Sequence, residues 1–229
     1  MKPVTQANRI GWSKFSGLSS ADAQDRHRRV LPMSRALDRT LAEVLGCRLC
    51  AAELPLGPRP VLRLAPQTRL LLVGQAPSST VHASGLPFDG RSGDRLRDWL
   101  GIDRDEFYGN ARLGFMPIGF CYTGRNARGG DNPPARICAT TWHPRLRPLL
   151  PNVEMTLLVG QYALARYLGP RRKASLTETV AAWRDYLPEF LPLPHPSWRN
   201  TGWLRGHPWF EREVVTELRR QVRRLLQLP

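Results

Sequence analysis

The chain has 229 residues, 41% of them hydrophobic, which is enough for one compact domain with a buried core and argues against a disordered protein. Its 34 Lys and Arg residues against 19 Asp and Glu give a net charge of +15, which favours a polyanionic partner. No apolar run reaches the roughly 18 residues of a membrane-spanning helix, and the N-terminus lacks the apolar stretch of a signal peptide.

The N-terminal residues 1–34 are polar and aperiodic, and they contain the basic cluster Arg26-His27-Arg28-Arg29. This composition predicts a flexible basic tail. A helix is expected from about Ser34 to Leu45, where apolar residues recur at helical spacing before Gly46. We assign residues 35–229 to a single domain.

Alternating strand and helix patterns follow. Short apolar runs predict buried strands at Leu70–Val73, Ala111–Phe120, Val153–Val159 and Phe190–Leu193. Helices are expected at Ser92–Leu100, Gln161–Leu168, Ser175–Leu187 and Pro208–Leu226. A further short helix should begin at the capping pair Asp103 and Glu106. Between Pro134 and Leu150 we expect a helix that is broken by His143-Pro144 and Pro148. This order predicts a three-layer α/β/α sandwich around a central, mostly parallel four-stranded sheet.

Two strand ends carry unusual turns. Gly74 and Pro77 break the chain abruptly after the first strand, at the edge of the sheet where α/β proteins bind ligands. The fourth strand leads into Pro194-His195-Pro196, in which two prolines fix the backbone on either side of a histidine. These two turns are the candidate site.

The residues of both turns resemble a known family. Gly74-Gln75-Ala76-Pro77 resembles the first motif of the uracil-DNA glycosylase superfamily, and His195-Pro196-Ser197 resembles its second. The segment from Gly85 to Gly90 resembles the one that supplies the family's base-stacking Phe. The resemblance covers about residues 45–218. It implies a DNA glycosylase of base excision repair, which hydrolyses the N-glycosidic bond of a flipped-out damaged base, with uracil the expected base.

The resemblance also assigns roles to individual residues. His195 and the backbone N–H groups of Gln75 and Ala76 would donate hydrogen bonds to the departing base as it gains negative charge. Substrate binding falls to Gly74, Pro77, Phe88, Asp89 and Ser197, with Phe88 stacking on the base. Simple structural roles remain open for single positions: a loop hydrogen bond for His195, packing for Phe88 and turn formation for Asp89.

The first motif departs from the family pattern. Several branches carry a carboxylate there to activate or orient water, whereas Gln75 and Ala76 cannot act as a general base. Either Asp89 substitutes for it, or the mechanism relies mainly on stabilising the leaving group. The family's better-known branches also place an Asn near the end of the second strand to read the base, and the stretch from Met116 to Phe120 has none.

The segment after the second motif is expected to contact DNA. Trp198, Arg199 and Asn200 follow it, in a pattern that resembles the single-strand-selective branch. Stacking of Trp198 on an exposed base would contribute about 1–3 kcal/mol, and Arg199 is a candidate wedge or phosphate contact. The alternative is that the tryptophans of this segment pack beneath the loop, which we favour for Trp203.

The chain has four cysteines, Cys47, Cys50, Cys121 and Cys138. Four thiolates suit zinc or an iron–sulfur cluster. Their layout resembles the thermophile-type branch of the superfamily, which implies a 4Fe–4S cluster that pins the N-terminal segment to the loop between Tyr122 and Pro134. Zinc and free buried thiols are the alternatives.

These features lead us to expect a cytoplasmic, monomeric DNA-binding enzyme with no membrane contact. Two other functions remain open. One is a non-catalytic nucleic-acid-binding member of the same fold, which the missing carboxylate and Asn favour. The other is an enzyme that acts on a different N-glycoside, such as a free nucleoside, although a small neutral substrate needs no broad basic surface.

Overall fold

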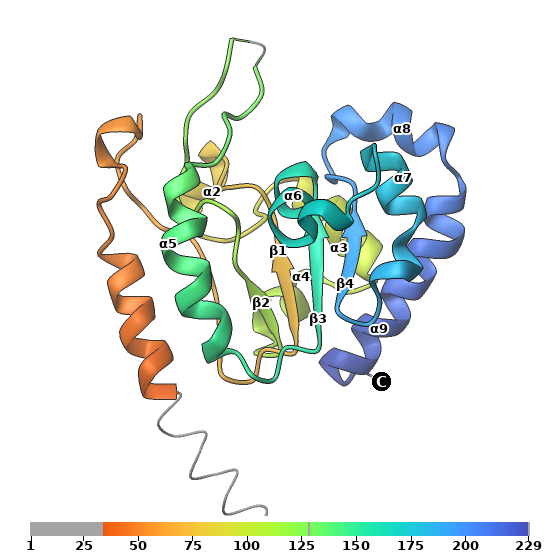
Figure 1. Ribbon diagram of the computed structural model, residues 1–229, viewed down its shortest axis with the longest axis horizontal. Helices are drawn as coiled ribbons and strands as arrows, with labels where there is room; N and C mark the ends of the chain where they lie inside the picture. The colour runs from red at the N-terminus through yellow and green to blue at the C-terminus, as the bar shows by residue number, and fades with distance from the viewer. Residues whose placement is uncertain (1–33, 128, 229) are drawn as a thin grey trace, which may run out of the picture.

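A four-stranded parallel sheet forms the centre of the computed structural model, which describes residues 34–127 and 129–228 (Figure 1). The strands are β1 (Leu70–Val73), β2 (Leu113–Phe115), β3 (Met155–Val159) and β4 (Phe190–Leu193), in the spatial order β2-β1-β3-β4. All three pairings are parallel. This confirms the predicted fold class. The second strand is shorter than the predicted run and ends at Phe115, although the N–H groups of Met116 and Ile118 still donate to carbonyls of Leu72 and Gly74.

Every residue of the four strands is buried, and alternate side chains point into two different cores. Leu70 and Leu72 join one cluster, with residues of α3, α4 and α9. Leu71 and Val73 join the other, with α5, α6 and the helix over residues 34–45. The sheet is therefore covered by helices on both faces, as the uninterrupted apolar strands require.

The helices largely follow the sequence pattern. The α-helices are α2 (Ser79–Ser84), α3 (Arg91–Leu100), α4 (Arg104–Gly109), α5 (Arg136–Leu146), α6 (Gln161–Leu168), α7 (Leu176–Ala181), α8 (Thr201–Gly206) and α9 (Thr216–Leu226), preceded by the helix over residues 34–45. A π-helical segment, Phe210–Val215, leads into α9, and 3-10 turns lie at Ala51–Glu53, Arg147–Leu149, Gly169–Arg171, Trp183–Tyr186 and Trp198–Asn200.

Two helical predictions need correction. Helix α5 continues through Pro144 and ends in a 3-10 turn, Arg147–Leu149; Pro144 lies in the last turn, where its missing N–H removes only one bond of the helix. The helix predicted from Ser175 to Leu187 ends at Ala181, and the chain tightens into the turn Trp183–Tyr186. That turn buries Trp183 and Tyr186, and the Tyr186 hydroxyl donates to the carbonyl of Arg171.

The N-terminal helix over residues 34–45 lies beside α5 (Figure 1), and Glu43 pairs with Arg145. The tail predicted for residues 1–34, including its basic cluster, falls outside the described residues except for its last position. Within the described residues, no helix is both long and apolar enough to cross a membrane.

Candidate active site

A cleft of about 210 Å³ lies at the carboxyl end of β1. The first-motif residues Gly74–Pro77 line it together with Phe88, Asp89 and His195. The structure thus brings together three segments that lie far apart in the sequence. A neighbouring hollow at the end of β3 shares Gln75 and His195 with this cleft, so these two side chains lie between the two spaces.

The first-motif turn leaves backbone donors available. The carbonyl groups of Gly74 and Gln75 accept hydrogen bonds from Ile118 and Gly119, both at 2.9 Å. Among the described residues, no backbone hydrogen bond outside the helices and strands uses the N–H of Gln75 or Ala76 as its donor. Ser78 then starts α2 by accepting from the N–H of Val81 at 3.3 Å. The turn therefore presents unpaired N–H groups beside the cleft.

Two glycines fix the position of Phe88. A Cβ atom on Gly74 would lie 2.9 Å from Cζ of Phe88, so the aromatic ring packs directly against the end of β1. A Cβ atom on Gly93 would lie 1.6 Å from the Phe88 carbonyl oxygen. Phe88 itself has a φ of +56°, a conformation that is rare for a residue with a bulky side chain. The close packing around this strained residue aligns its ring with the cleft, where a base could stack on it.

His195 follows β4 and is held from both sides. The side-chain amide of Asn200 donates to the His195 carbonyl at 2.7 Å, and the His195 side chain lies next to Gly160 at the end of β3. The imidazole lies among protein atoms, and this burial lowers its pKa to about 4. His195 is therefore neutral near pH 7 and can donate one hydrogen bond without carrying a charge. Among the described residues, its ring makes no hydrogen bond that would compete.

The loop after the second motif is braced by Arg95 of α3. Its guanidinium donates to the carbonyl of Ser197 at 2.9 Å and to the hydroxyl of Thr201 at 3.2 Å. The Ser197 hydroxyl accepts from the N–H of Arg199 at 3.1 Å, and Trp198 is 69% exposed. The side chains of Ser197 and Asn200 thus stabilise the loop, and Trp198 projects into solvent beside the cleft.

Trp203 packs beneath this loop, as expected. Its indole N–H donates to the hydroxyl of Thr177 at 2.8 Å, and its ring stacks on the His207 imidazole with 4.5 Å between the ring centroids. Trp203 therefore belongs to the support of the loop.

The loop over residues 121–134 contributes a cleft residue that the sequence analysis missed. Its described residues, 121–127 and 129–134, extend beyond the carboxyl ends of the strands (Figure 1), and Asp131 lines the cleft with His195 and Phe88. Asp131 is an exposed residue, yet desolvation of its carboxylate raises its pKa, while Arg125 and Arg199 oppose that shift. An aspartate in a Gly-, Asn- and Pro-rich loop gives no sequence signal of its own, so only the tertiary structure identifies it.

The other cleft carboxylate, Asp89, is paired. Its Oδ1 lies 3.2 Å from Nη1 of Arg104 in a hydrogen-bonded ion pair.

A buried histidine, His143, contacts the wall of the cleft. Its Nε2 lies 3.0 Å from the carbonyl oxygen of Pro117, which lines the cleft, and its Nδ1 lies 2.8 Å from the Tyr167 hydroxyl. Burial lowers the pKa of His143 to about 4, so it is a neutral structural group near pH 7.

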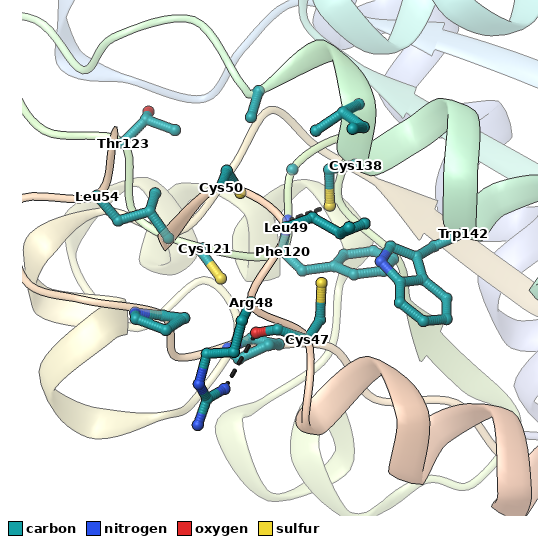
Figure 2. A pocket seen from close by; sticks show the side chains of 15 residues that line it. Cys47, Arg48, Leu49, Cys50, Leu54, Phe120, Cys121, Thr123, Cys138 and Trp142 are labelled. Carbon is teal, nitrogen blue, oxygen red and sulfur yellow. Dashed lines mark hydrogen bonds between the residues drawn. The ribbon is translucent and has the colours of Figure 1, made fainter. Parts of the chain in front are cut away.

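All four cysteines line one pocket, separate from the cleft (Figure 2). Cys47 and Cys50 follow the N-terminal helix, Cys121 follows β2, and Cys138 lies in α5. None forms a disulfide. Burial raises the pKa of Cys121 to about 11 and that of Cys138 to about 12, so both are neutral thiols in this environment.

Two N–H donors lie at the cysteine pocket. The N–H of Phe120 donates to Sγ of Cys138 at 3.3 Å. Trp142 is 6% exposed and lies at the pocket wall (Figure 2), and its buried indole N–H has no hydrogen-bond partner among the residues that the structure describes. In the part of the chain that the structure describes, no three His, Cys, Asp or Glu side chains are placed to hold a metal ion.

One comparison with known proteins identifies a family. The family model described as "Uracil DNA glycosylase superfamily" matches residues 63–219. The matched range contains the first-motif turn, Phe88, Asp131 and His195, whereas Cys47 and Cys50 precede it.

Proposed function

The chain belongs to the uracil DNA glycosylase superfamily, and we propose that it is a DNA glycosylase that hydrolyses the N-glycosidic bond of an extruded damaged base, with uracil as the expected base. The observation that carries this proposal is that His195, Phe88, Gln75 and Ala76 line one cleft, with no backbone hydrogen bond in the described part of the chain using the N–H of Gln75 or Ala76. Family membership supports a glycosylase role in general; the base and the catalytic activity are our inference.

The cleft suits the charge changes of this reaction. When the bond between base and deoxyribose breaks, negative charge develops on the base and positive charge on the sugar. The N–H groups of Gln75 and Ala76 and the neutral His195 can donate to base oxygens as that charge grows, without reorganising at the moment of reaction. Phe88 offers its ring as a stacking surface for a base held outside the helix.

DNA binding follows from the residues around the cleft. Arg199 and the exposed Trp198 lie on the loop after His195, and the exposed Arg91 lines the cleft itself. Together with the net charge of +15, these residues support phosphate contacts and stacking on an unpaired base. The segment from His195 to Asn200 resembles that of the single-strand-selective branch, so the test includes single- and double-stranded substrates.

The test is a cleavage assay on labelled oligonucleotides that carry uracil, hypoxanthine, xanthine or a thymine mismatch, in single- and double-stranded form. Abasic products are revealed by alkali. His195→Ala should abolish product formation while DNA affinity is retained. His207→Ala is the matched control, because it removes a histidine that lies outside the cleft. Product that persists in His195→Ala would reject the assigned role of His195.

A specific observation also favours a non-catalytic DNA-binding role. The amide of Gln75 is engaged with a backbone carbonyl, and the first motif carries no carboxylate. If the folded protein binds DNA but releases no base from any of these substrates, the chain is a DNA-binding member of the family and the glycosylase proposal fails.

We also propose that Cys47, Cys50, Cys121 and Cys138 hold a 4Fe–4S cluster, as their layout implies. Four unbridged thiols line one pocket, and the unpartnered N–H of Trp142 is a donor of the kind that cluster sulfurs accept. A single zinc ion with bonds of about 2.3 Å would need sulfurs within about 3.8 Å of one another, whereas a four-iron cluster spreads its ligands more widely. When bound, the cluster would cross-link the N-terminal segment to α5 and the loop after β2.

Iron and sulfide analysis tests this second proposal. Protein purified without oxygen should contain about four irons and four sulfides per chain, and Cys138→Ser should lose most of both. Arg136→Ser, at an exposed position of the same helix that does not line the pocket, is the control. Anaerobic protein that is colourless and free of iron would reject the cluster.

A further inference from the structure

We propose that Asp131 is the carboxylate that orients and activates the attacking water, in the role that the first motif of this chain leaves unfilled. The inference rests on the proposed glycosylase function and names a catalytic residue for it. It starts from position: Asp131 lines the same cleft as His195, Gln75 and Phe88, although it belongs to the loop after β2.

The loop that carries Asp131 is fastened to the first motif and to the segment that follows the second. The amide Nε2 of Gln75 donates to the carbonyl of Asn132 at 3.0 Å, next to Asp131 itself. On the other side, Arg199 donates to the carbonyl of Gly129 at 2.9 Å. Within the loop, the backbones of Asp131 and Arg125 form an isolated antiparallel β-bridge. Contacts from its two flanking residues to the first motif and to Arg199 hold Asp131 in a defined position at the cleft, as catalysis requires.

The state of the carboxylate distinguishes Asp131 from Asp89. Asp89 is hydrogen-bonded to Arg104. In residues 34–127 and 129–228, Asp131 receives no side-chain hydrogen bond or ion pair, and its charged neighbours Arg125 and Arg199 act on it only through space. Its lone pairs are therefore available to a water molecule. Partial desolvation makes this carboxylate a stronger base than one in open solvent.

The step balances without any further reactant. The bond between C1′ and the base breaks, and its electron pair leaves with the base, where His195 and the turn N–H groups receive the negative charge. A water oxygen forms a new bond to C1′, and one of its protons passes to the Asp131 carboxylate. The negative carboxylate also stabilises the positive charge on the sugar before the water attacks.

The test compares three conservative variants under single-turnover conditions, with enzyme in excess over a uracil-containing oligonucleotide. Asp131→Asn should slow base release by about 100-fold or more, with affinity for the oligonucleotide within about twofold of the parent. Asp105→Asn makes the same change at an exposed site on α4 and should leave the rate unchanged. Asp89→Asn tests the competing carboxylate and should cause a smaller loss than Asp131→Asn.

The pH profile separates catalysis from a structural role. The parent rate should fall as the pH drops through the raised pKa of Asp131, whereas Asp131→Asn should lose this acidic limb. Arg125 and Arg199 keep their charge throughout this range, and His195 becomes charged only near its pKa of about 4. An active parent with an unchanged Asp131→Asn rate overturns the inference alone. A folded but inactive parent overturns the proposed function, and the inference with it.

Discussion

The side-chain amide of Gln75 donates to the backbone carbonyl of Asn132 at 3.0 Å, and so joins the first-motif turn to the loop that carries Asp131. A residue of the first motif, which in this chain carries no carboxylate, is thus used to position a different loop. Gln75→Ala should slow base release by about 10- to 100-fold, because a small displacement of a catalytic group is costly. The free energy of unfolding should fall by only about 0.5–1.5 kcal/mol.

Single-turnover assays and urea unfolding measure these two quantities for Gln75→Ala. Hydrogen exchange of residues 129–134 should also become faster in the variant. A variant with the parent rate and the parent exchange pattern would contradict the proposed tether.

Gly93 should tolerate no side chain. A Cβ atom there would lie 1.6 Å from the Phe88 carbonyl oxygen, so Gly93→Ala must move the backbone of α3 or of Phe88. We expect a loss of at least about 3 kcal/mol, the upper end for overpacked sites. Gly109→Ala is the matched control, since its new methyl group would meet no atom within 4 Å, and it should leave stability unchanged or slightly raised. Equal melting temperatures for the two variants would refute the close contact.

Acidification should destabilise the protein through its two buried histidines. Burial lowers the pKa of both His143 and His195 to about 4, whereas the unfolded chain has values near 6.5. As the pH falls, these histidines therefore take up protons in the unfolded state before they do so in the folded state. Their contribution to the free energy of unfolding is complete above pH 6.5 and is lost as the pH falls from about 6.5 towards 4.

Urea unfolding at several pH values checks this linkage. The loss by pH 4 should be at most about 3 kcal/mol for each of the two histidines, and the total should be smaller in His143→Asn, whose side chain cannot be protonated. An unfolding free energy that stays constant from about pH 7 to pH 4 would show that these histidines are not held neutral.

Arg199 should contribute to DNA binding through a phosphate. Arg199→Ala should weaken binding to oligonucleotides of any sequence and reduce the slope of log affinity against log salt by about 1. Arg212→Ala removes an exposed arginine of the C-terminal helical segment and should change the slope little. Arg199 also donates to the carbonyl of Gly129 in the loop that carries Asp131, so its removal could change the cleavage rate for another reason. The binding measurement, not the rate, therefore tests this prediction. An unchanged slope would place Arg199 outside the DNA contact.

Trp142 should tune the proposed cluster. Its buried indole N–H lines the cysteine pocket without a partner, and hydrogen bonds to cluster sulfurs favour the reduced state. Trp142→Phe should therefore keep its iron but show a more negative reduction potential. Trp183→Phe, at a buried tryptophan in the opposite core, is the control. A potential identical to that of the parent would mean that the indole does not reach the cluster.

Much of the fold follows from local sequence patterns. The four apolar runs became the four parallel strands, and Gly101 and Asp103 end and begin helices where expected. Such features depend on neighbouring residues, so sequence spacing predicts them well. The two prolines around His195 and the break after β1 likewise marked both turns of the site, because proline and glycine act on the backbone at their own positions.

Other parts of the site depended on contacts between distant segments. The pairing of Asp89 with Arg104, the bond from Gln75 to Asn132 and the position of Asp131 over the cleft join residues whose local sequence carries no sign of the partner. The sequence by itself determined the strands, the turns and the presence of His195 and Phe88. Only the tertiary structure decided which carboxylate faces the cleft unpaired, because desolvation and ion pairing arise when the chain packs against itself.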